Sequence, residues 1–138
     1  MTYNIDDAIS ELKGLSIDTP MKPDLPDDAL LDRYEAKLDL KFPDDYRKFL
    51  KSASNVFVGT LSPLIATESM NSPTDILIGL SEARKIGLPD SWLPICEDNG
   101  DYYCLDDDQV RFWSHNGSTN ESWDNLATWI KNVWIDES

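Results

Sequence analysis

The stretch formed by residues 93–113 limits the possible folds more than any other part of the sequence. Strand-favouring residues at 95–96 and 102–105 flank Asn-Gly at 99–100, a pair typical of a two-residue type I′ hairpin turn because both turn positions need positive φ. A second polar turn at 106–109 leads into another short run of strand formers. We therefore predict a β-meander of three antiparallel strands joined by two turns.

The turns of this predicted meander are rich in carboxylates. Between residues 97 and 108 the sequence holds six acidic residues and no Lys or Arg. These six residues are Glu97, Asp98, Asp101, Asp106, Asp107 and Asp108. Across the chain, 26 acidic residues outnumber 12 basic ones, and the formal net charge is −14. The excess is uneven, because residues 56–138 hold 14 acidic and only 4 basic residues.

This charge balance excludes some classes of partner. Direct binding to nucleic acid needs clustered Lys and Arg against the phosphates, and an anionic membrane surface needs the same. Two interpretations of the acidic surface stay open: a soluble, mutually repulsive surface, or a docking surface for a basic partner. The N-terminus has no basic start followed by an apolar run, and no stretch approaches the ~20 apolar residues of a membrane span. We predict a cytoplasmic protein.

A length of 138 residues with 41% hydrophobic residues fits one domain, residues 1–138, that can bury a core. Apolar residues at helical spacing predict a short helix at residues 5–12, ended by Gly14, and a Pro-rich lead-in follows up to Pro26. A second helix is capped by Asp27 or Asp28. A third begins at Pro43, which suits a first turn, with Asp44 and Asp45 at the positive end of the helix dipole.

The second half of the chain gives further expectations. Residues 56–59 are predicted as a strand and 61–73 as irregular structure. Residues 76–78 fit either a strand or the start of a helix that ends near Gly87. A C-terminal helix is predicted to bury one continuous apolar face and to pack on the meander, with Ser118 or Ser122 as its cap. The residues of this face are Trp123, Leu126, Ala127, Ile130, Val133 and Trp134.

No residue set supports catalysis, a cofactor or a metal. His115 is the one histidine, and its neighbour Ser114 would point to the opposite face of a strand, so the two do not form a nucleophile–base pair. The carboxylates near the turns lack the spacing and the central Gly of an EF-hand loop. Cys96 and Cys104 with one histidine do not make a zinc site, and both are predicted to be reduced and buried.

Two motifs in order resemble one known family. The sequence Phe-Pro-Asp-Asp-Tyr at 42–46 leads through 49–50 into Val-Phe-Val-Gly-Thr-Leu at 56–61, and the stretch 93–102 is followed by Val110 and Trp-Ser-His-Asn-Gly at 113–117. This pattern resembles the SUKH superfamily of SMI/KNR-type domains. The resemblance covers roughly residues 28–135 and leaves residues 1–27 outside. It implies an α+β domain in which several helices pack around one curved, mostly antiparallel sheet.

The resemblance also implies a function without catalysis. Many bacterial members look like immunity proteins that neutralise a toxin, often a nuclease, whereas eukaryotic members look like regulatory interaction modules. We therefore expect a non-enzymatic immunity protein that binds a basic toxin through its acidic surface, with a regulatory protein-binding module as the alternative. Candidate contact residues are the six acidic residues above together with Tyr102, Trp113 and His115.

The aromatic residues of the meander form two adjacent pairs, Tyr102–Tyr103 and Phe112–Trp113. Because neighbouring residues on a strand point to opposite faces, one member of each pair should face the core. We predict that Tyr102 and Trp113 lie nearer the functional face. The alternative is that all four belong to the core.

Overall fold

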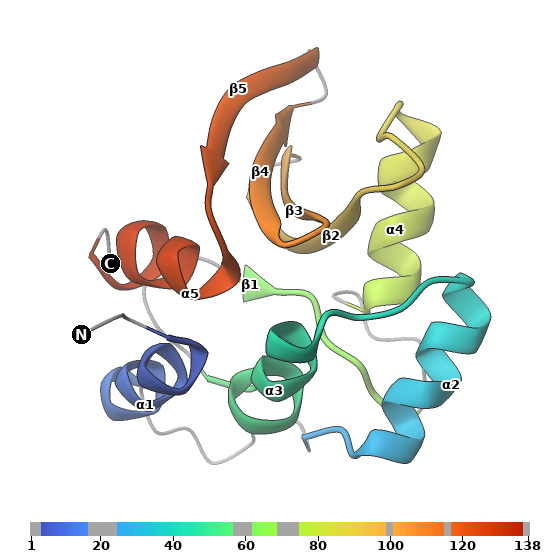
Figure 1. Ribbon diagram of the computed structural model, residues 1–138. Coiled ribbons are helices and arrows are strands. Elements are labelled where there is room, and N and C mark those ends of the chain that lie inside the picture. The colour runs from blue at the N-terminus through green and yellow to red at the C-terminus, as the bar shows by residue number, and fades with distance from the viewer. Residues whose placement is uncertain are drawn as a thin grey trace.

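The computed structural model describes residues 4–16, 25–56, 62–68, 75–98, 101–114 and 117–136. The helices are α1 (Ile5–Leu15), α2 (Asp28–Leu38), α3 (Asp44–Ala53), α4 (Ile76–Lys85) and α5 (Leu126–Trp129). The strands are β1 (Ser62–Pro63), β2 (Leu93–Asp98), β3 (Asp101–Asp106), β4 (Gln109–Ser114) and β5 (Gly117–Trp123). In Figure 1, α4 lies beside a curved sheet and the other helices lie below it. The predicted α+β class is confirmed.

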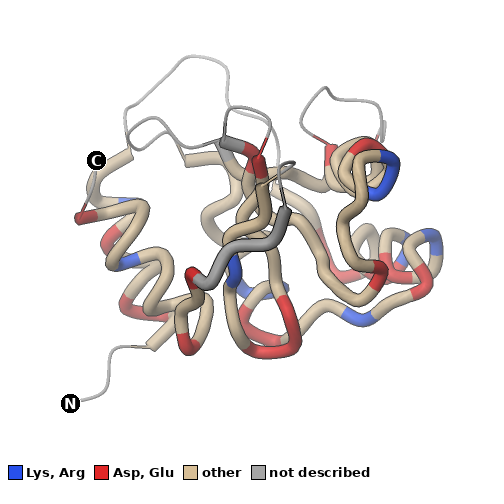
Figure 2. The backbone as a smooth tube through the Cα atoms, turned by 90° about the horizontal axis from the view of Figure 1, so that it is seen from above, with Lys and Arg blue, Asp and Glu red and all other residues tan. Residues whose placement is uncertain are grey.

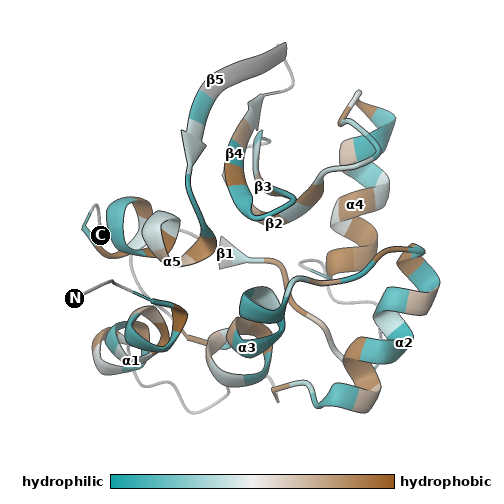
Figure 3. Ribbon diagram, viewed as in Figure 1, coloured by the Kyte–Doolittle hydropathy of each residue, from teal (hydrophilic) through white to brown (hydrophobic). Residues whose placement is uncertain are grey.

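The predicted meander forms the middle of the sheet. The described strands are antiparallel and follow one another in chain order, from β1 at one edge to β5 at the other. Asp98 pairs with Asp101, which leaves two residues for the first connection, and Asp106 pairs with Gln109 across the second. Hydrophobic segments of β4, α1, α4 and α5 lie toward the middle of the molecule (Figure 3).

Strand β5 corrects the prediction for residues 117–123. Ser118 and Ser122 lie on this strand, which pairs with β4, so neither of them caps a helix. The helix begins at Leu126, and Asn125 caps it by accepting a hydrogen bond from the backbone N–H of Thr128 at 2.8 Å. Trp123 therefore belongs to the sheet and not to the helix. A polar edge strand has no alternating hydrophobic pattern, and its place is set by backbone pairing with β4.

The C-terminal helix buries its predicted apolar face in a different geometry. After α5 it continues as a π-helix over Ile130–Ile135, in which residues five apart share one face. Trp129 and Trp134 are five apart, and both are buried with their ring centroids 6.0 Å apart. The π-helical turn thus places both tryptophans in the core. An ion pair of 3.3 Å between Glu11 and Lys131 joins this helix to α1.

The N-terminal helix is longer than predicted. Asn4 caps α1 by accepting from the backbone N–H of Asp7 at 2.9 Å, and the Asp7 carboxylate accepts from the backbone N–H of Asn4. Gly14 was expected to end the helix, but the helix passes through it and ends at Leu15. Gly14 does not adopt the positive φ that a glycine takes at a helix end, so it does not stop the hydrogen-bonding pattern.

A buried carboxylate fixes the connection between α2 and α3. Glu35 accepts a hydrogen bond from the backbone N–H of Phe42 at 2.7 Å and lies 3.2 Å from the guanidinium of Arg47. The ring of Phe42 packs edge-on against Tyr46, with centroids 5.4 Å apart. Pro43 is the N-cap of α3, one position before the expected first turn. The start of α3 is therefore held by packing, by hydrogen bonding and by charge.

Helix α4 decides the open alternative at residues 76–78 in favour of a helix. Asp75 caps α4 by accepting from the backbone N–H of Leu77 at 2.8 Å, and its carboxylate also accepts from the Tyr34 hydroxyl at 2.5 Å.

The stretch expected to be irregular contains β1, which pairs with β2. The strand predicted at 56–59 falls outside the described residues apart from Val56. No helix in the described part of the chain is both long and apolar enough to cross a bilayer.

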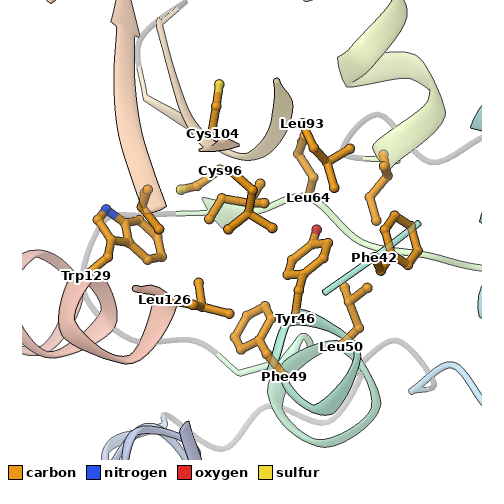
Figure 4. Close-up of a cluster of buried hydrophobic side chains, with 14 of the residues drawn as sticks. Phe42, Tyr46, Phe49, Leu50, Leu64, Leu93, Cys96, Cys104, Leu126 and Trp129 are labelled. Carbon is orange, nitrogen blue, oxygen red and sulfur yellow. The ribbon is translucent and has the colours of Figure 1, made fainter. Parts of the chain in front are cut away.

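The described part of the core contains a tyrosine hydroxyl without a partner. Figure 4 shows the side chain of Tyr46 reaching from α3 into a cluster that includes Leu64, Cys96 and Leu126. The Tyr46 hydroxyl is fully buried and forms no hydrogen bond with a described residue. Cys96 and Cys104 are both buried free thiols, as predicted.

We predict that Glu35→Ala lowers the free energy of unfolding by about 2–3 kcal/mol, because it leaves the Phe42 N–H and the Arg47 guanidinium without their buried acceptor. Urea denaturation measures this change. Asp32→Ala is the matched control, since Asp32 also pairs with Arg47 but its side chain is 69% exposed. Its loss should cost less than about 1 kcal/mol. Equal effects of the two substitutions would contradict the role assigned to Glu35.

A second prediction compares two tyrosines that undergo the same chemical change. Tyr46→Phe should raise the free energy of unfolding by about 1 kcal/mol, because it removes an unsatisfied buried hydroxyl. Tyr34→Phe should lower it by about 1–3 kcal/mol, because the Tyr34 hydroxyl bonds to Asp75 and to the backbone of Thr67. Thermal or urea denaturation of the two variants tests the opposite signs.

Tyr46 also gives a prediction for stability at alkaline pH. Burial raises the pKa of the Tyr46 hydroxyl above its ordinary value of 10.0. The folded state therefore keeps a proton that the unfolded state loses, so stability is fully present below about pH 10 and falls as the pH rises. Tyr46→Phe should make this fall shallower by up to about 1.4 kcal/mol per pH unit. Denaturation curves collected between about pH 9 and 11 would show an unchanged slope if this assignment is wrong.

Candidate partner-binding groove

The turn between β3 and β4 carries three adjacent carboxylates in different surroundings. Asp106 lies 3.0 Å from Nε of Arg111, whose guanidinium is 5.7 Å from the ring centroid of Trp92. Asp107 and Asp108 form the turn and are exposed. Asp107 has a φ of 53°, which aspartate adopts more readily than most residues. One of the three charges is therefore balanced inside the protein, and two face the solvent.

Two neighbouring hollows share this turn as a wall. The first, of about 630 Å³, lies between the turn, the start of α3 and the connection from β5 to α5. The second, of about 530 Å³, extends along the α2–α3 connection toward Ser91. We call the two together the acidic groove. Its acidic lining residues are Asp44, Asp45, Asp107, Asp108 and Asp124.

The charge of this groove comes from three segments that are far apart in the sequence. Asp44 and Asp45 occupy the first turn of α3, where the helix dipole favours a negative charge. Asp124 lies directly before Asn125, the cap of α5. Among the described residues that line the groove, Lys41 is the single basic one. Figure 2 shows acidic positions recurring along the loops and helix ends while basic positions are few.

The floor of the groove is rigid. Phe42, Leu105 and Leu126 line it, and their exposed fractions are only 4%, 4% and 3%. These side chains belong to the close-packed core, so the backbone segments that carry the carboxylates are held in place before any partner arrives. A preformed site loses less conformational entropy on binding than a flexible one does.

The carboxylates of the groove do not converge on a metal. Within the described part of the chain, no three His, Cys, Asp or Glu residues come together as potential ligands of one ion. Negative charges spread along a groove instead suit several positive groups of one macromolecular partner. The prediction that Asp107 and Asp108 contribute to binding stays a prediction, and the structure adds Asp44, Asp45 and Asp124 beside them.

The structure divides the acidic residues predicted from the sequence between two places. Asp98 and Asp101 lie at one end of strand β3, and Asp106 to Asp108 lie at the other. Five residue steps along a strand span about 17 Å. Glu97 is exposed on β2 near the first end, and Asp101 is half-buried. His115 lies outside the described residues.

Tyr102 and Trp113, which we predicted to lie nearer the functional face, are buried. Their exposed fractions are 5% and 4%, and they pair with each other across β3 and β4, with ring centroids 6.4 Å apart. Burial, together with the carboxylates of Glu97 and Glu82, raises the pKa of Tyr102 above its ordinary value. The alternating residues Tyr103 and Phe112 are half-buried and pack against each other on the opposite face. The members of each pair do point to opposite faces of the sheet, as predicted. The face that carries Tyr102 and Trp113, toward α4, is more deeply buried than the other.

The choice of face could not have been made from the meander alone. Trp113 reaches toward Gly87, where a side-chain carbon added to the glycine would lie 3.9 Å from its ring. The chain between α4 and β2 therefore covers this side of the sheet. Contacts with the segment before β2, which strand alternation does not reveal, decide which aromatic residues are buried.

Comparisons with known proteins agree with this fold. The family model SUKH_5, described as SMI1-KNR4 cell-wall, matches residues 5–135. A crystal structure of a protein from Pseudomonas syringae pv. tomato is 32% identical to this chain, with a TM-score of 0.88. The aligned region covers 95% of this chain and 98% of the Pseudomonas syringae chain. A comparison with curated proteins gives no match. The family match includes α1 and so extends beyond residues 28–135, over which the sequence analysis found the resemblance.

We predict that repulsion among the aspartates of the acidic groove lowers the stability of the free protein. Asp108→Asn should raise the melting temperature of the free protein by about one or two degrees at low ionic strength, because it relieves repulsion among the neighbouring carboxylates. The difference should vanish in about 1 M salt, where charges more than about 3 Å apart are screened. Differential scanning calorimetry at two salt concentrations measures both effects. A lower melting temperature for the variant would show that Asp108 stabilises the fold.

Proposed function

Because the chain belongs to the SMI1-KNR4 cell-wall family SUKH_5, we propose that it is a non-enzymatic immunity-type protein. It binds a cognate basic toxin, such as a nuclease, through the acidic groove and thereby blocks the toxin. It acts in the cytoplasm, where a toxin of this kind finds its target. The observation that carries this proposal is a rigid groove with five aspartates in a chain of net charge −14.

Electrostatic complementarity explains how such a groove could serve this function. A nuclease presents a positive surface that is shaped for phosphates, and spaced carboxylates can occupy the same positive groups. Complementary fields speed the encounter of the two proteins, and acidic proteins are rejected as partners. Speed matters because the toxin must be bound before it reaches its substrate.

The chemistry of the interior supports a binding role over catalysis. Cys96 and Cys104 are buried, and burial raises the pKa of the Cys104 thiol far above its ordinary value, so its reactive thiolate form is suppressed. The carboxylate of Asp75 is fully buried and already accepts hydrogen bonds from Tyr34 and from the start of α4. These groups are committed to the fold.

A regulatory module that binds a cytosolic partner is the second candidate. The family description refers to the cell wall and not to a toxin, and this observation favours a regulatory role. Genomic context separates the two candidates. A toxin-bearing reading frame beside the gene supports immunity, and co-expression with that toxin domain should then restore cell survival and yield a co-purified complex. Survival without a complex, or a complex without survival, would contradict direct neutralisation.

We predict that Asp107→Asn with Asp108→Asn weakens binding to the cognate toxin domain about tenfold or more, because each lost pair with a basic group weakens the complex. Asn keeps the positive φ at position 107 accessible. Isothermal titration calorimetry at several salt concentrations measures the affinity, and its salt dependence should become weaker.

The matched control is Glu68→Gln with Glu82→Gln. It removes the same number of charges from exposed positions that do not line the groove. Its affinity for the toxin should stay close to that of the wild-type protein. If both double variants bind equally weakly, net charge and not the groove determines the affinity. If neither loses affinity, the interface lies elsewhere.

A further inference from the structure

A third hollow has the opposite charge. It measures about 460 Å³ and lies between α2 and α4. Three leucines and three bases line it together with Ser81, and we call it the basic groove. These residues are Leu38, Leu77, Leu80, Lys37, Arg84 and Lys85. It shares no lining residue with the acidic groove, and the connection from α2 to α3 separates the two.

The bases of this groove are available to a partner. Lys37 and Lys85 are exposed, and neither forms an ion pair within the described part of the chain. Arg84 donates to the backbone carbonyl of Asp90 at 3.0 Å and lies 3.9 Å from its carboxylate, so one charge is partly balanced. Each base lies in the last turn of its helix, where the dipole favours a positive charge. The dipole explains a base at each helix end, but it does not explain why both helix ends line one hollow that also contains a half-exposed leucine, Leu77.

The chain itself carries a segment that fits this groove. The β3–β4 turn lines both hollows of the acidic groove. At its tip, Asp107 and Asp108 are exposed and make no ion pair with a described residue. A two-residue turn is a compact segment, and its two carboxylates match in number and in sign the two lysines that form no ion pair with a described residue.

We propose that the protein associates with a second copy of itself, with the β3–β4 tip of one copy in the basic groove of the next. Asp107 and Asp108 pair with Lys37 and Lys85, and the apolar floor of the groove packs beneath the turn. Because tip and groove are different surfaces, the contact is heterologous and runs head to tail. Each terminal copy keeps one free tip or one free groove.

Net charge sets the strength of this association. Two copies of charge −14 repel each other, although salt screens the repulsion beyond about 8 Å at physiological ionic strength. The contact is also small compared with a stable dimer interface. The complex is therefore weak and dependent on concentration, and the local charge pairs select its orientation. It requires no toxin and does not depend on the proposed function.

Sedimentation velocity over a range of protein concentrations tests this proposal. The average mass of the wild-type protein should rise with concentration and pass beyond two copies. Lys37→Gln with Lys85→Gln removes the two lysine charges of the groove and leaves Arg84. Asp107→Asn with Asp108→Asn removes the tip charges. Each variant alone should associate about tenfold more weakly, because two exposed ion pairs are lost.

Mixing the two variants gives the sharper test. The groove variant keeps an intact tip, and the tip variant keeps an intact groove, so the mixture should form a one-to-one complex with the wild-type affinity. Growth beyond two copies should be about tenfold weaker than for the wild-type protein, since the remaining groove lacks its two lysines and the remaining tip lacks its two carboxylates. Labelling one variant with a fluorophore identifies the mixed species during sedimentation.

The matched control is Lys13→Gln with Lys48→Gln. It removes two exposed bases that do not line the groove and gives the same net charge as the groove variant. It should associate like the wild-type protein. A wild-type protein that stays monomeric at all concentrations would overturn the proposal. So would an equal loss of association in the control, or a mixture of the two variants that forms no complex. Circular dichroism confirms that each variant is folded.

Discussion

A single buried carboxylate fixes the connection between α2 and α3, and the arrangement of the two surface grooves depends on that connection. Glu35 binds the backbone of Phe42 and the guanidinium of Arg47, and so fixes the connection that leads from α2 into α3. That connection sets where α3 begins, and Asp44 and Asp45 take their places in the groove from it. The same connection separates the acidic groove from the basic one. Burying one charge at the right position thus arranges many charges at the surface.

Local patterns predicted the fold well wherever the signal lay within a few residues. Asp27 caps α2, and the meander follows from its turn residues and strand formers. Strand β5 was missed because its residues are polar and its place is set by pairing with β4. The helix boundary at Gly14 failed because glycine permits a helix end but does not impose one. Predictions failed where the local sequence carried no signal for the deciding feature.

The candidate site shows the same limit more strongly. Sequence analysis identified the acidic turn, but it assigned Asp44 and Asp45 only to the dipole of α3. No local pattern reveals that this helix start packs beside the turn, and Asp124 had no signal at all. The two proposed roles of the surface are linked, because Asp107 and Asp108 line the proposed toxin site and also form the proposed self-association tip. Toxin binding and self-association would therefore compete for the same two carboxylates.

The backbone at Asp107 has a consequence for how such a protein can change over evolutionary time. Its φ of 53° restricts that position to residues such as Asp, Asn and Gly, whereas the following position carries no such restriction. Asp44 and Asp45 are restricted in another way, because a base at a helix start weakens the helix. Under the proposed function, adaptation to a new toxin is therefore easiest at Asp108, where a substitution would alter recognition and leave the scaffold intact.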